Sequence, residues 1–205
     1  MRRVLLLLIS MFSIAAFSQT ESKDSSVEYE RIYIEAGFLQ PIGKLSNKFD
    51  LSPSFGFWYR TKMNREDFID FGFNFFIPKK PLNVNFKYRD SVVQYKSSHF
   101  AINIGTRFAK VISLSQRKTD FNLEWNSGIG LALNFYNAQK ELEFESGEHT
   151  KEVLTTFYLS QGIKLNYRNA GLQCHYQWSP YGLFNDQVET NFGSQSLMFG
   201  IVYRQ

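Results

Sequence analysis

Residues 121–136, with the sequence FNLEWNSGIGLALNFY, alternate between two kinds of side chain. One set is apolar and consists of Phe121, Leu123, Trp125, Ile129, Leu131, Leu133 and Phe135. The other set is polar or small and consists of Asn122, Glu124, Asn126, Gly128, Gly130, Ala132 and Asn134. Successive side chains of a β-strand point to opposite faces, so this stretch predicts a strand with one apolar face.

The same alternation recurs along the chain and predicts an all-β fold. Strands are expected at residues 31–40, 54–62, 68–77, 99–110, 121–136, 153–168, 171–179 and 196–204. The second, fourth and sixth intervals between them are short, and the other intervals are longer. Short periplasmic turns and longer outer loops are typical of outer-membrane barrels. The sequence therefore predicts an eight-stranded antiparallel up-and-down transmembrane β-barrel.

The two faces of the strands differ in their content of aromatic residues and glycines. The apolar face carries eighteen aromatic residues: Phe38, Phe55, Phe57, Tyr59, Phe71, Phe73, Phe75, Phe100, Phe108, Phe121, Trp125, Phe135, Phe157, Tyr167, Tyr176, Trp178, Phe199 and Tyr203. The opposite face carries Gly37, Gly56, Gly72, Gly105, Gly128, Gly130, Gly162 and Gly200. Eight strands enclose an interior only just wide enough for side chains. We therefore expect the aromatic face to meet lipid, although a soluble lipocalin-like carrier of a small ligand is an alternative.

Six charged residues fall on the face that is expected to line the lumen. They alternate in sign from strand to strand: Glu35, Arg60, Asp70, Arg107, Glu124 and Lys164. Neighbouring strands lie about 4.8 Å apart, which permits ion pairs between them. Paired charges are tolerated in a narrow interior, whereas isolated ones are costly. These residues are expected to form a structural plug, without a catalytic role, that closes the lumen. Separate solvation of each charge by small water pockets is the alternative.

The N-terminus predicts export. Arg2 and Arg3 precede a short apolar stretch, and Ala16-Phe17-Ser18 fits a small-x-small cleavage site. We expect residues 1–18 to be a signal peptide, 19–30 a flexible lead-in and 31–205 the barrel in the outer membrane of a Gram-negative cell. Without the two arginines the formal net charge of +4 falls to +2. No clustered basic face is visible, which argues against nucleic-acid binding.

The opening and closing strands carry a family resemblance. Residues 37–43 read Gly-Phe-Leu-Gln-Pro-Ile-Gly, and the last strand reads Leu197-Met198-Phe199-Gly200-Ile201-Val202-Tyr203. With the pattern of the whole chain, these segments resemble the small outer-membrane barrels of the OmpA and OmpX kind. They are also similar to the outer-membrane β-barrel domain family that includes PorT-like proteins. The resemblance implies an outer-membrane location and no common activity.

The residues give little support for catalysis. Barrels that edit lipid A, a further alternative function, would need a histidine near a serine and an acid. None of the three histidines, His99, His149 and His175, begins a His-x-Ser sequence. No paired His or Cys spacing suggests a metal site. We expect no catalytic residue, no metal and no cofactor.

The outer loops are the better candidates for binding, since loops on a rigid scaffold often carry it. Residues 79–96 alternate as a hairpin that continues beyond the membrane, and residues 140–152 are acidic. Both are candidate sites for a protein partner. The hairpin could instead pack on its neighbours, and the acidic loop could simply be solvated. We expect a monomer, in contact with outer-membrane lipid and lipopolysaccharide, with a structural or adhesive role or as an accessory to a secretion or surface machine.

Overall fold

The computed structural model describes residues 31–78, 83–88, 91–114, 121–138, 151–184, 186, 188 and 192–205. The predicted signal peptide (1–18) and lead-in (19–30) lie outside this part. The strands are β1 Ile32–Ile42, β2 Ser52–Lys62, β3 Asp67–Phe76, β4 Asn83–Tyr88, β5 Ser91–Ser113, β6 Phe121–Ala138, β7 Lys151–Tyr167, β8 Ala170–Trp178 and β9 Gln195–Arg204. A 3₁₀ turn, η1 Gly43–Asn47, follows β1, and the one-turn helix α2 Tyr181–Phe184 follows β8. No helix in these ranges is long and apolar enough to cross a membrane.

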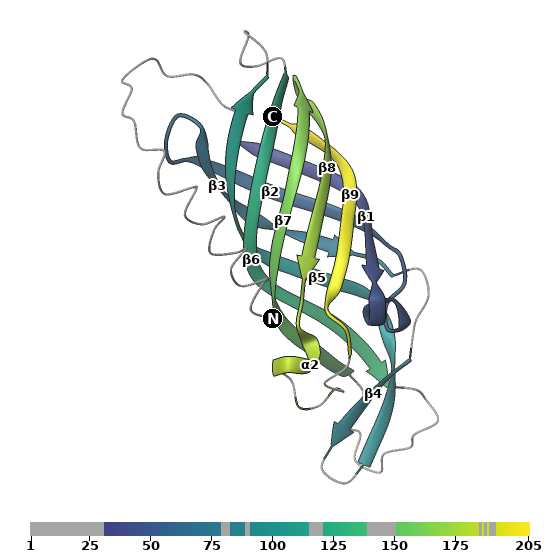
Figure 1. The fold of residues 1–205 in the computed structure, drawn as a ribbon. Coiled ribbons are helices and arrows are strands. Elements are labelled where there is room, and N and C mark those ends of the chain that lie inside the picture. Colours follow the sequence, from purple (N-terminus) through teal and green to yellow (C-terminus); the bar gives the residue numbers. More distant parts are fainter. Residues whose placement is uncertain are drawn as a thin grey trace.

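Eight of the strands close into a barrel (Figure 1). The order β3-β2-β1-β9-β8-β7-β6-β5 is closed by a further pairing between β3 and β5. Every pairing is antiparallel. The predicted fold, an eight-stranded antiparallel barrel, is confirmed, and it is the fold that the family resemblance implies.

One strand lies outside the barrel wall. β4 pairs only with the start of β5 in the described part, and the two form the hairpin expected within residues 79–96. β5 therefore begins at Ser91, eight residues before the predicted start at residue 99. The register of β5 against β6 shifts between Ser97 and Ala101. Such irregularities bend a strand, and the hairpin projects past one end of the barrel (Figure 1).

The two ends of the barrel differ, as the interval lengths predicted. At the end that we call the turn end, residues 63–66 join β2 to β3 and residues 168–169 join β7 to β8. The backbone N–H of Arg31 donates to the carbonyl oxygen of Gln205 there at 2.9 Å, so both ends of the described chain lie at this end. The opposite end, the loop end, carries η1, α2 and the β4–β5 hairpin (Figure 1).

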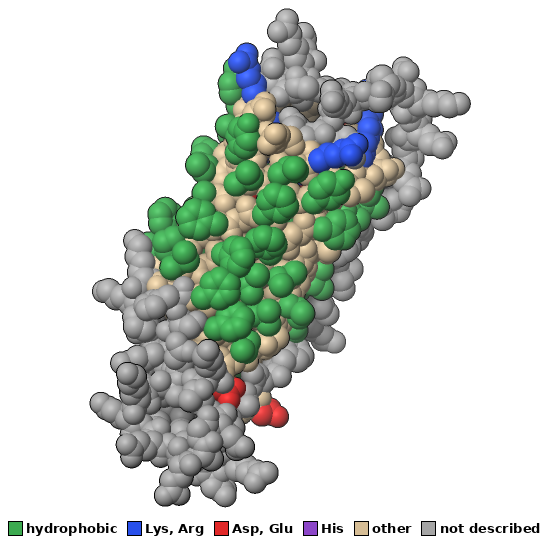
Figure 2. Space-filling model, turned by 180° about the vertical axis from the view of Figure 1, so that it is seen from behind, with side chains coloured by type: hydrophobic (Ala, Val, Ile, Leu, Met, Phe, Trp, Pro, Cys, Tyr) green, Lys and Arg blue, Asp and Glu red, His purple; other side chains and the backbone are tan. Residues whose placement is uncertain are grey.

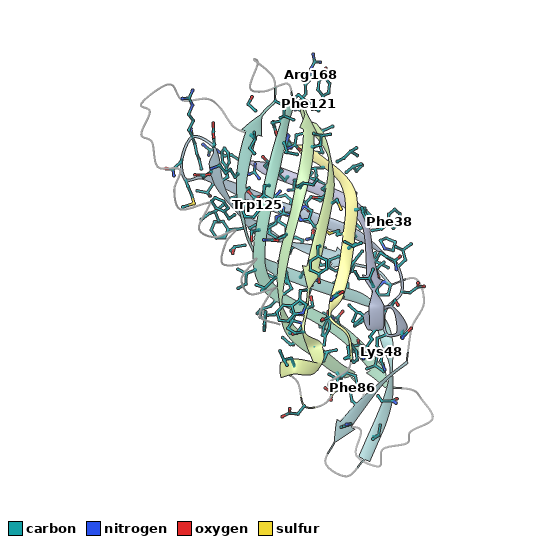
Figure 3. All side chains as sticks on the ribbon, viewed as in Figure 1. Phe38, Lys48, Phe86, Phe121, Trp125 and Arg168 are labelled. Carbon is teal, nitrogen blue, oxygen red and sulfur yellow. The ribbon has the colours of Figure 1, made fainter. Side chains whose placement is uncertain are left out.

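The outer wall is apolar. None of the eighteen aromatic residues expected on this face is buried, and Phe55 and Tyr167 expose more than half of their surface. On the side shown in Figure 2, hydrophobic side chains cover much of the wall between the two ends, and Lys and Arg side chains lie at the turn end. Phe38 projects outward from β1 (Figure 3). A wall of this kind faces lipid, and the barrel is a transmembrane one.

Glycines permit the tight curvature of the inner face. Gly37 of β1 lies opposite Gly200 of β9, and Gly105 of β5 lies opposite both Gly72 and Gly130. A Cβ atom at Gly37 would collide with the carbonyl oxygen of Phe199 in the neighbouring strand. These positions let neighbouring backbones approach where a side chain would push them apart.

Candidate functional site

The six charged residues singled out in the sequence come from six different strands of the barrel. Glu35 lies on β1, Arg60 on β2, Asp70 on β3, Arg107 on β5, Glu124 on β6 and Lys164 on β7. The structure places all six inside the lumen, where none exposes more than 2% of its surface. Each lies nearer the turn end than the loop end of its strand. We call this set the lumen ring.

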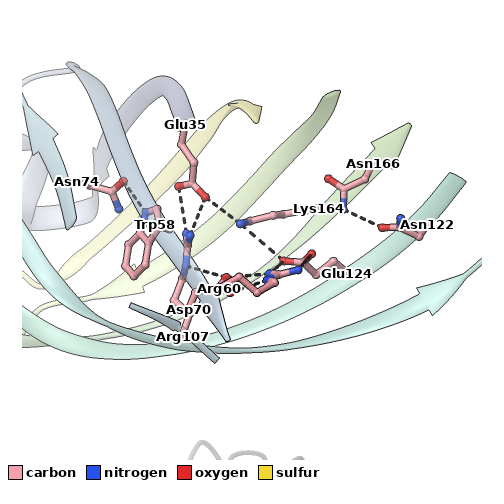
Figure 4. A network of polar contacts seen from close by, with 10 residues as sticks. All are labelled: Glu35, Trp58, Arg60, Asp70, Asn74, Arg107, Asn122, Glu124, Lys164 and Asn166. Carbon is pink, nitrogen blue, oxygen red and sulfur yellow. Dashed lines mark hydrogen bonds and ion pairs between the residues drawn. The ribbon is translucent and has the colours of Figure 1, made fainter. Parts of the chain in front are cut away.

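The lumen ring is a closed circuit of opposite charges (Figure 4). Arg60 Nε lies 2.6 Å from Asp70 Oδ1, and Arg60 Nη2 lies 2.7 Å from Glu124 Oε1. Lys164 Nζ lies 3.7 Å from Glu124 Oε1 and 2.8 Å from Glu35 Oε1. Arg107 Nη2 lies 2.8 Å from Glu35 Oε1, and its Nε lies 3.9 Å from Asp70 Oδ2. Each charge thus has two neighbours of opposite sign, and three acids balance three bases.

The arginines contribute most of the hydrogen bonds. Arg60 donates from Nε and Nη2 to the two oxygens of Asp70, and from Nη1 and Nη2 to the two oxygens of Glu124. Arg107 donates from Nη1 and Nη2 to both oxygens of Glu35. Two-pronged contacts of a guanidinium with a carboxylate fix geometry as well as charge. The lumen ring therefore holds the side chains of opposite walls in one arrangement.

Some contacts of the lumen ring follow the wall, and others cross the lumen. Arg60 and Asp70 are register partners on β2 and β3, and Glu124 and Lys164 are partners on β6 and β7. In contrast, Arg60 reaches Glu124 across the interior. The alternation of sign predicted ion pairs between neighbouring strands. Glu35 instead contacts Arg107 and Lys164, because the register of the closed barrel brings those side chains to its level.

Aromatic side chains that the sequence analysis did not select cover the cations. The guanidinium carbon of Arg60 lies 4.1 Å from the ring centre of Tyr33, and that of Arg107 lies 3.5 Å from the ring of Trp58. Trp58 Nε1 donates to Asn74 Oδ1 at 3.3 Å (Figure 4). A cation over an aromatic face gains further electrostatic stabilisation when both are dry. The sequence did carry a signal for Trp58, because Trp58 lies two residues before Arg60 and therefore points to the same face of β2.

Other polar side chains fill the lumen on either side of the lumen ring. Asn166 Nδ2 donates to Asn122 Oδ1 at 2.9 Å, and Asn103 Nδ2 donates to Gln177 Oε1 at 3.0 Å. His175 is also buried in the barrel, with 2% of its surface exposed. The side chains of His99 and His149 lie outside the described part. The polar interior and apolar exterior are the reverse of a soluble barrel.

A cluster of buried apolar side chains lies at the loop end of the barrel. This cluster, the apolar lid, comprises Leu45, Phe49, Val84, Phe86, Tyr136, Leu154, Tyr181, Val188 and Phe192. It draws residues from η1, β4, β6, β7, α2 and the segment before β9. The ring centres of Phe49 and Tyr181 lie 5.6 Å apart, and those of Phe86 and Tyr136 lie 5.3 Å apart. Phe86 lies at the loop end in Figure 3.

A small cavity lies directly under the apolar lid. Its volume is about 30 Å³, and Phe49, Tyr181, Asn103, Asn134 and Gln177 are among the side chains that line it. A water molecule needs about 10–15 Å³ on this measure, so the cavity has room for about two waters. Burial raises the pKa of Tyr181 to about 12, so its hydroxyl is neutral and accepts a hydrogen bond from Asn134 Nδ2.

Comparison with known proteins yields similarity in solved structures alone. No family model matches the sequence, and no curated protein does. Among solved structures, the chain is similar to Ail, the attachment invasion locus protein of Yersinia pestis. The crystal structure with the heparin analogue sucrose octasulfate has 14% identity and a TM-score of 0.46, over 87% of this chain and 100% of that one. A second crystal structure of Ail has 17% identity and a TM-score of 0.41, with the same coverage. The backbone structure in a phospholipid nanodisc has 19% identity and a TM-score of 0.37, over 86% of this chain and 99% of that one.

Proposed function

We propose that this protein is a monomeric integral outer-membrane barrel whose lumen is closed, and that it serves as a rigid support for its loop end at the cell surface. The observation that carries this proposal is the combination of the lumen ring and the apolar lid, with a cavity of about 30 Å³ beneath the lid. Under this proposal the barrel conducts no ions and catalyses no reaction. Export through the signal expected at residues 1–18 completes the proposal.

The lumen ring opposes conduction by both size and charge. Eight strands leave room for side chains and little else. A hydrated ion that crossed the ring would have to break pairs such as Arg60–Asp70 and Glu35–Lys164, which are 2.6 and 2.8 Å long. Separating such buried partners leaves charges unpaired in a medium of low polarity, which is strongly unfavourable.

The loop end is the part that can act on another molecule. The hairpin of β4 and β5 is anchored there, because Val84 and Phe86 of β4 are fully buried in the apolar lid. Asn85 and Lys87, on the other face of β4, are exposed. The hairpin is thus held firmly while one of its faces stays accessible, which suits an adhesive or accessory surface within residues 79–96. The second candidate segment, 140–152, has residues 140–150 outside the described part.

Electrical recording tests the closed lumen. We expect the purified full-length protein, inserted in planar bilayers, to show little steady conductance, because the lumen ring and the apolar lid both obstruct the path. Correct folding of the protein should be checked independently, by comparing the gel migration of heated and unheated samples. A large, stable, open conductance from correctly folded protein would overturn the closed lumen and favour a porin-like role.

Surface labelling tests the orientation. With Cys174 replaced by serine, we expect Asn85→Cys on β4 to react with a membrane-impermeant maleimide in intact cells. Arg65→Cys, in the turn between β2 and β3, should react only after the cells are broken. Both positions are exposed, so a difference reports the side of the membrane. Labelling of Arg65→Cys alone in intact cells would invert the proposed orientation.

A further inference from the structure

A groove opens on the outside of the barrel at the loop end, separate from the lumen. Its volume is about 440 Å³, and it is formed by η1, by the chain that joins β8 to α2 and by the start of β9. Its lining includes Lys44, Trp178, Pro180, Leu183 and Gln195. We call it the rim groove. Its volume lies within the range of about 300–1,000 Å³ that is typical of small-ligand sites.

The rim groove lies at the border of the lipid-facing wall. Trp178 is the last residue of β8 and belongs to the outward aromatic set, where its ring centre lies 5.7 Å from that of Phe157. Its register partner on β9 is Gln195, an exposed polar residue. Aromatic residues in membrane barrels concentrate where hydrocarbon meets headgroups. The groove therefore spans the level at which acyl chains end and headgroups begin.

The two halves of the rim groove differ in chemistry. Trp178, Pro180 and Leu183 form an apolar half, and Leu183 exposes 68% of its surface. Lys44 and Gln195 form a polar half with a positive charge. A lipid acyl chain would remove water from Leu183, and an anionic headgroup would lie beside the Lys44 ammonium. The presence of apolar and cationic side chains in one groove matches the two parts of an acylated, phosphorylated lipid.

Two glycines in left-handed conformations shape the rim groove. Gly43 has a φ of 59° and Gly193 a φ of 99°, a region that glycine adopts readily and most residues avoid. A Cβ atom at Gly193 would collide with the backbone nitrogen of Leu45, so glycine lets the chain before β9 approach η1. A Cβ atom at Gly43 would meet nothing within 4 Å, so the space beside it is open.

We propose that the rim groove binds a phosphorylated glycolipid of the outer leaflet, with an acyl chain against Trp178 and Leu183 and a phosphate beside Lys44. The groove continues the lipid-facing wall, so this lipid can enter it from the membrane. The assignment to the outer leaflet rests on the proposed orientation of the loop end, whereas binding to the groove does not depend on the closed lumen. A bound lipid would hold η1 and α2 together at the base of the surface loops.

The test uses the full-length protein, stripped of lipid in detergent and titrated with bis-phosphorylated lipid A, with bound lipid counted by native mass spectrometry. We expect one lipid A to be retained and dephosphorylated lipid A to bind more weakly. Lys44→Gln should weaken binding of the phosphorylated form about fivefold, the effect expected of one lysine near an anionic surface. It should leave binding of the dephosphorylated form unchanged. Leu183→Asn should weaken both.

Two matched variants separate a specific site from general contact with lipid. Lys87→Gln removes an exposed lysine from β4, and Val92→Ser removes an apolar side chain of β5 that is 64% exposed. Both lie at the loop end outside the rim groove, and both should bind lipid A as the unchanged protein does. Equal losses for Lys44→Gln and Lys87→Gln, or equal retention of phosphatidylglycerol and lipid A, would overturn the proposal. Orientation has no influence in detergent, so a failure here is distinct from a failure of surface labelling.

Discussion

Replacing Arg60 with methionine is expected to lower the free energy of unfolding by about 3–5 kcal/mol, the usual cost of removing one partner from a buried ion pair. Arg60 is the nearest cation to both Asp70 and Glu124, at 2.6 and 2.7 Å. Neither carboxylate has any exposed surface. Without Arg60, the nearest cations are Arg107 at 3.9 Å from Asp70 and Lys164 at 3.7 Å from Glu124. Two acids would then be held by longer contacts, and the lumen ring would carry a net negative charge.

Urea titration of the protein folded in lipid vesicles, followed by tryptophan fluorescence, measures this change. The double variant Arg60→Met/Glu124→Gln restores a neutral lumen ring, so we expect it to be more stable than Arg60→Met alone. Arg65→Met removes an exposed arginine at the turn end and should change stability by no more than about 0.5 kcal/mol. A cost for Arg60→Met no greater than that for Arg65→Met would show that water, rather than the lumen ring, compensates these charges.

The sequence could predict the barrel because each strand shows the same alternation of apolar with polar or small residues. A residue at an even or odd position within a strand has a fixed face, so the alternation around Leu131 and Ala132 separates the two faces without any knowledge of the partners. The same parity puts Glu35, Arg60 and Asp70 on the inner face. It also places Trp58 on the inner face, opposite to the face that carries the eighteen outward aromatic residues.

The alternation gives the face on which a side chain lies but not its position along the barrel axis. For that reason the contacts within the lumen could not be predicted. Arg60 and Glu124 lie 64 residues apart and meet because the stagger of eight tilted strands brings them to one level. The apolar lid could not be predicted from the sequence for a related reason. Val84 of β4 and Phe192 before β9 belong to connections of irregular shape, and no periodic pattern states that they meet. The rim groove likewise depends on the left-handed turn at Gly43 and on Gly193.

Placing an arginine at Leu131 is expected to destabilise the barrel by about 2–4 kcal/mol, the cost of a cation on the lipid face near the midplane of the membrane. Leu131 exposes 53% of its surface on the outer wall, while its neighbour Ala132 is fully buried in the lumen. Its register partners are Ile104 on β5 and Phe157 on β7, so apolar side chains flank it on both sides. An arginine there has no anion on either neighbouring strand at its own level.

A position nearer the membrane surface provides the control for this prediction. Leu114, at the turn end just after β5, is 52% exposed, almost the same fraction as Leu131. Leu114→Arg should cost only about 0–1 kcal/mol, because an arginine near the interface reaches water and headgroups. Both variants can be unfolded in urea from vesicles of the same phospholipid. A soluble carrier predicts a different result, since arginine on a water-exposed wall would change stability by no more than about 0.5 kcal/mol at either position. A large cost at Leu131 combined with a small one at Leu114 is expected only if the outer wall lies in lipid.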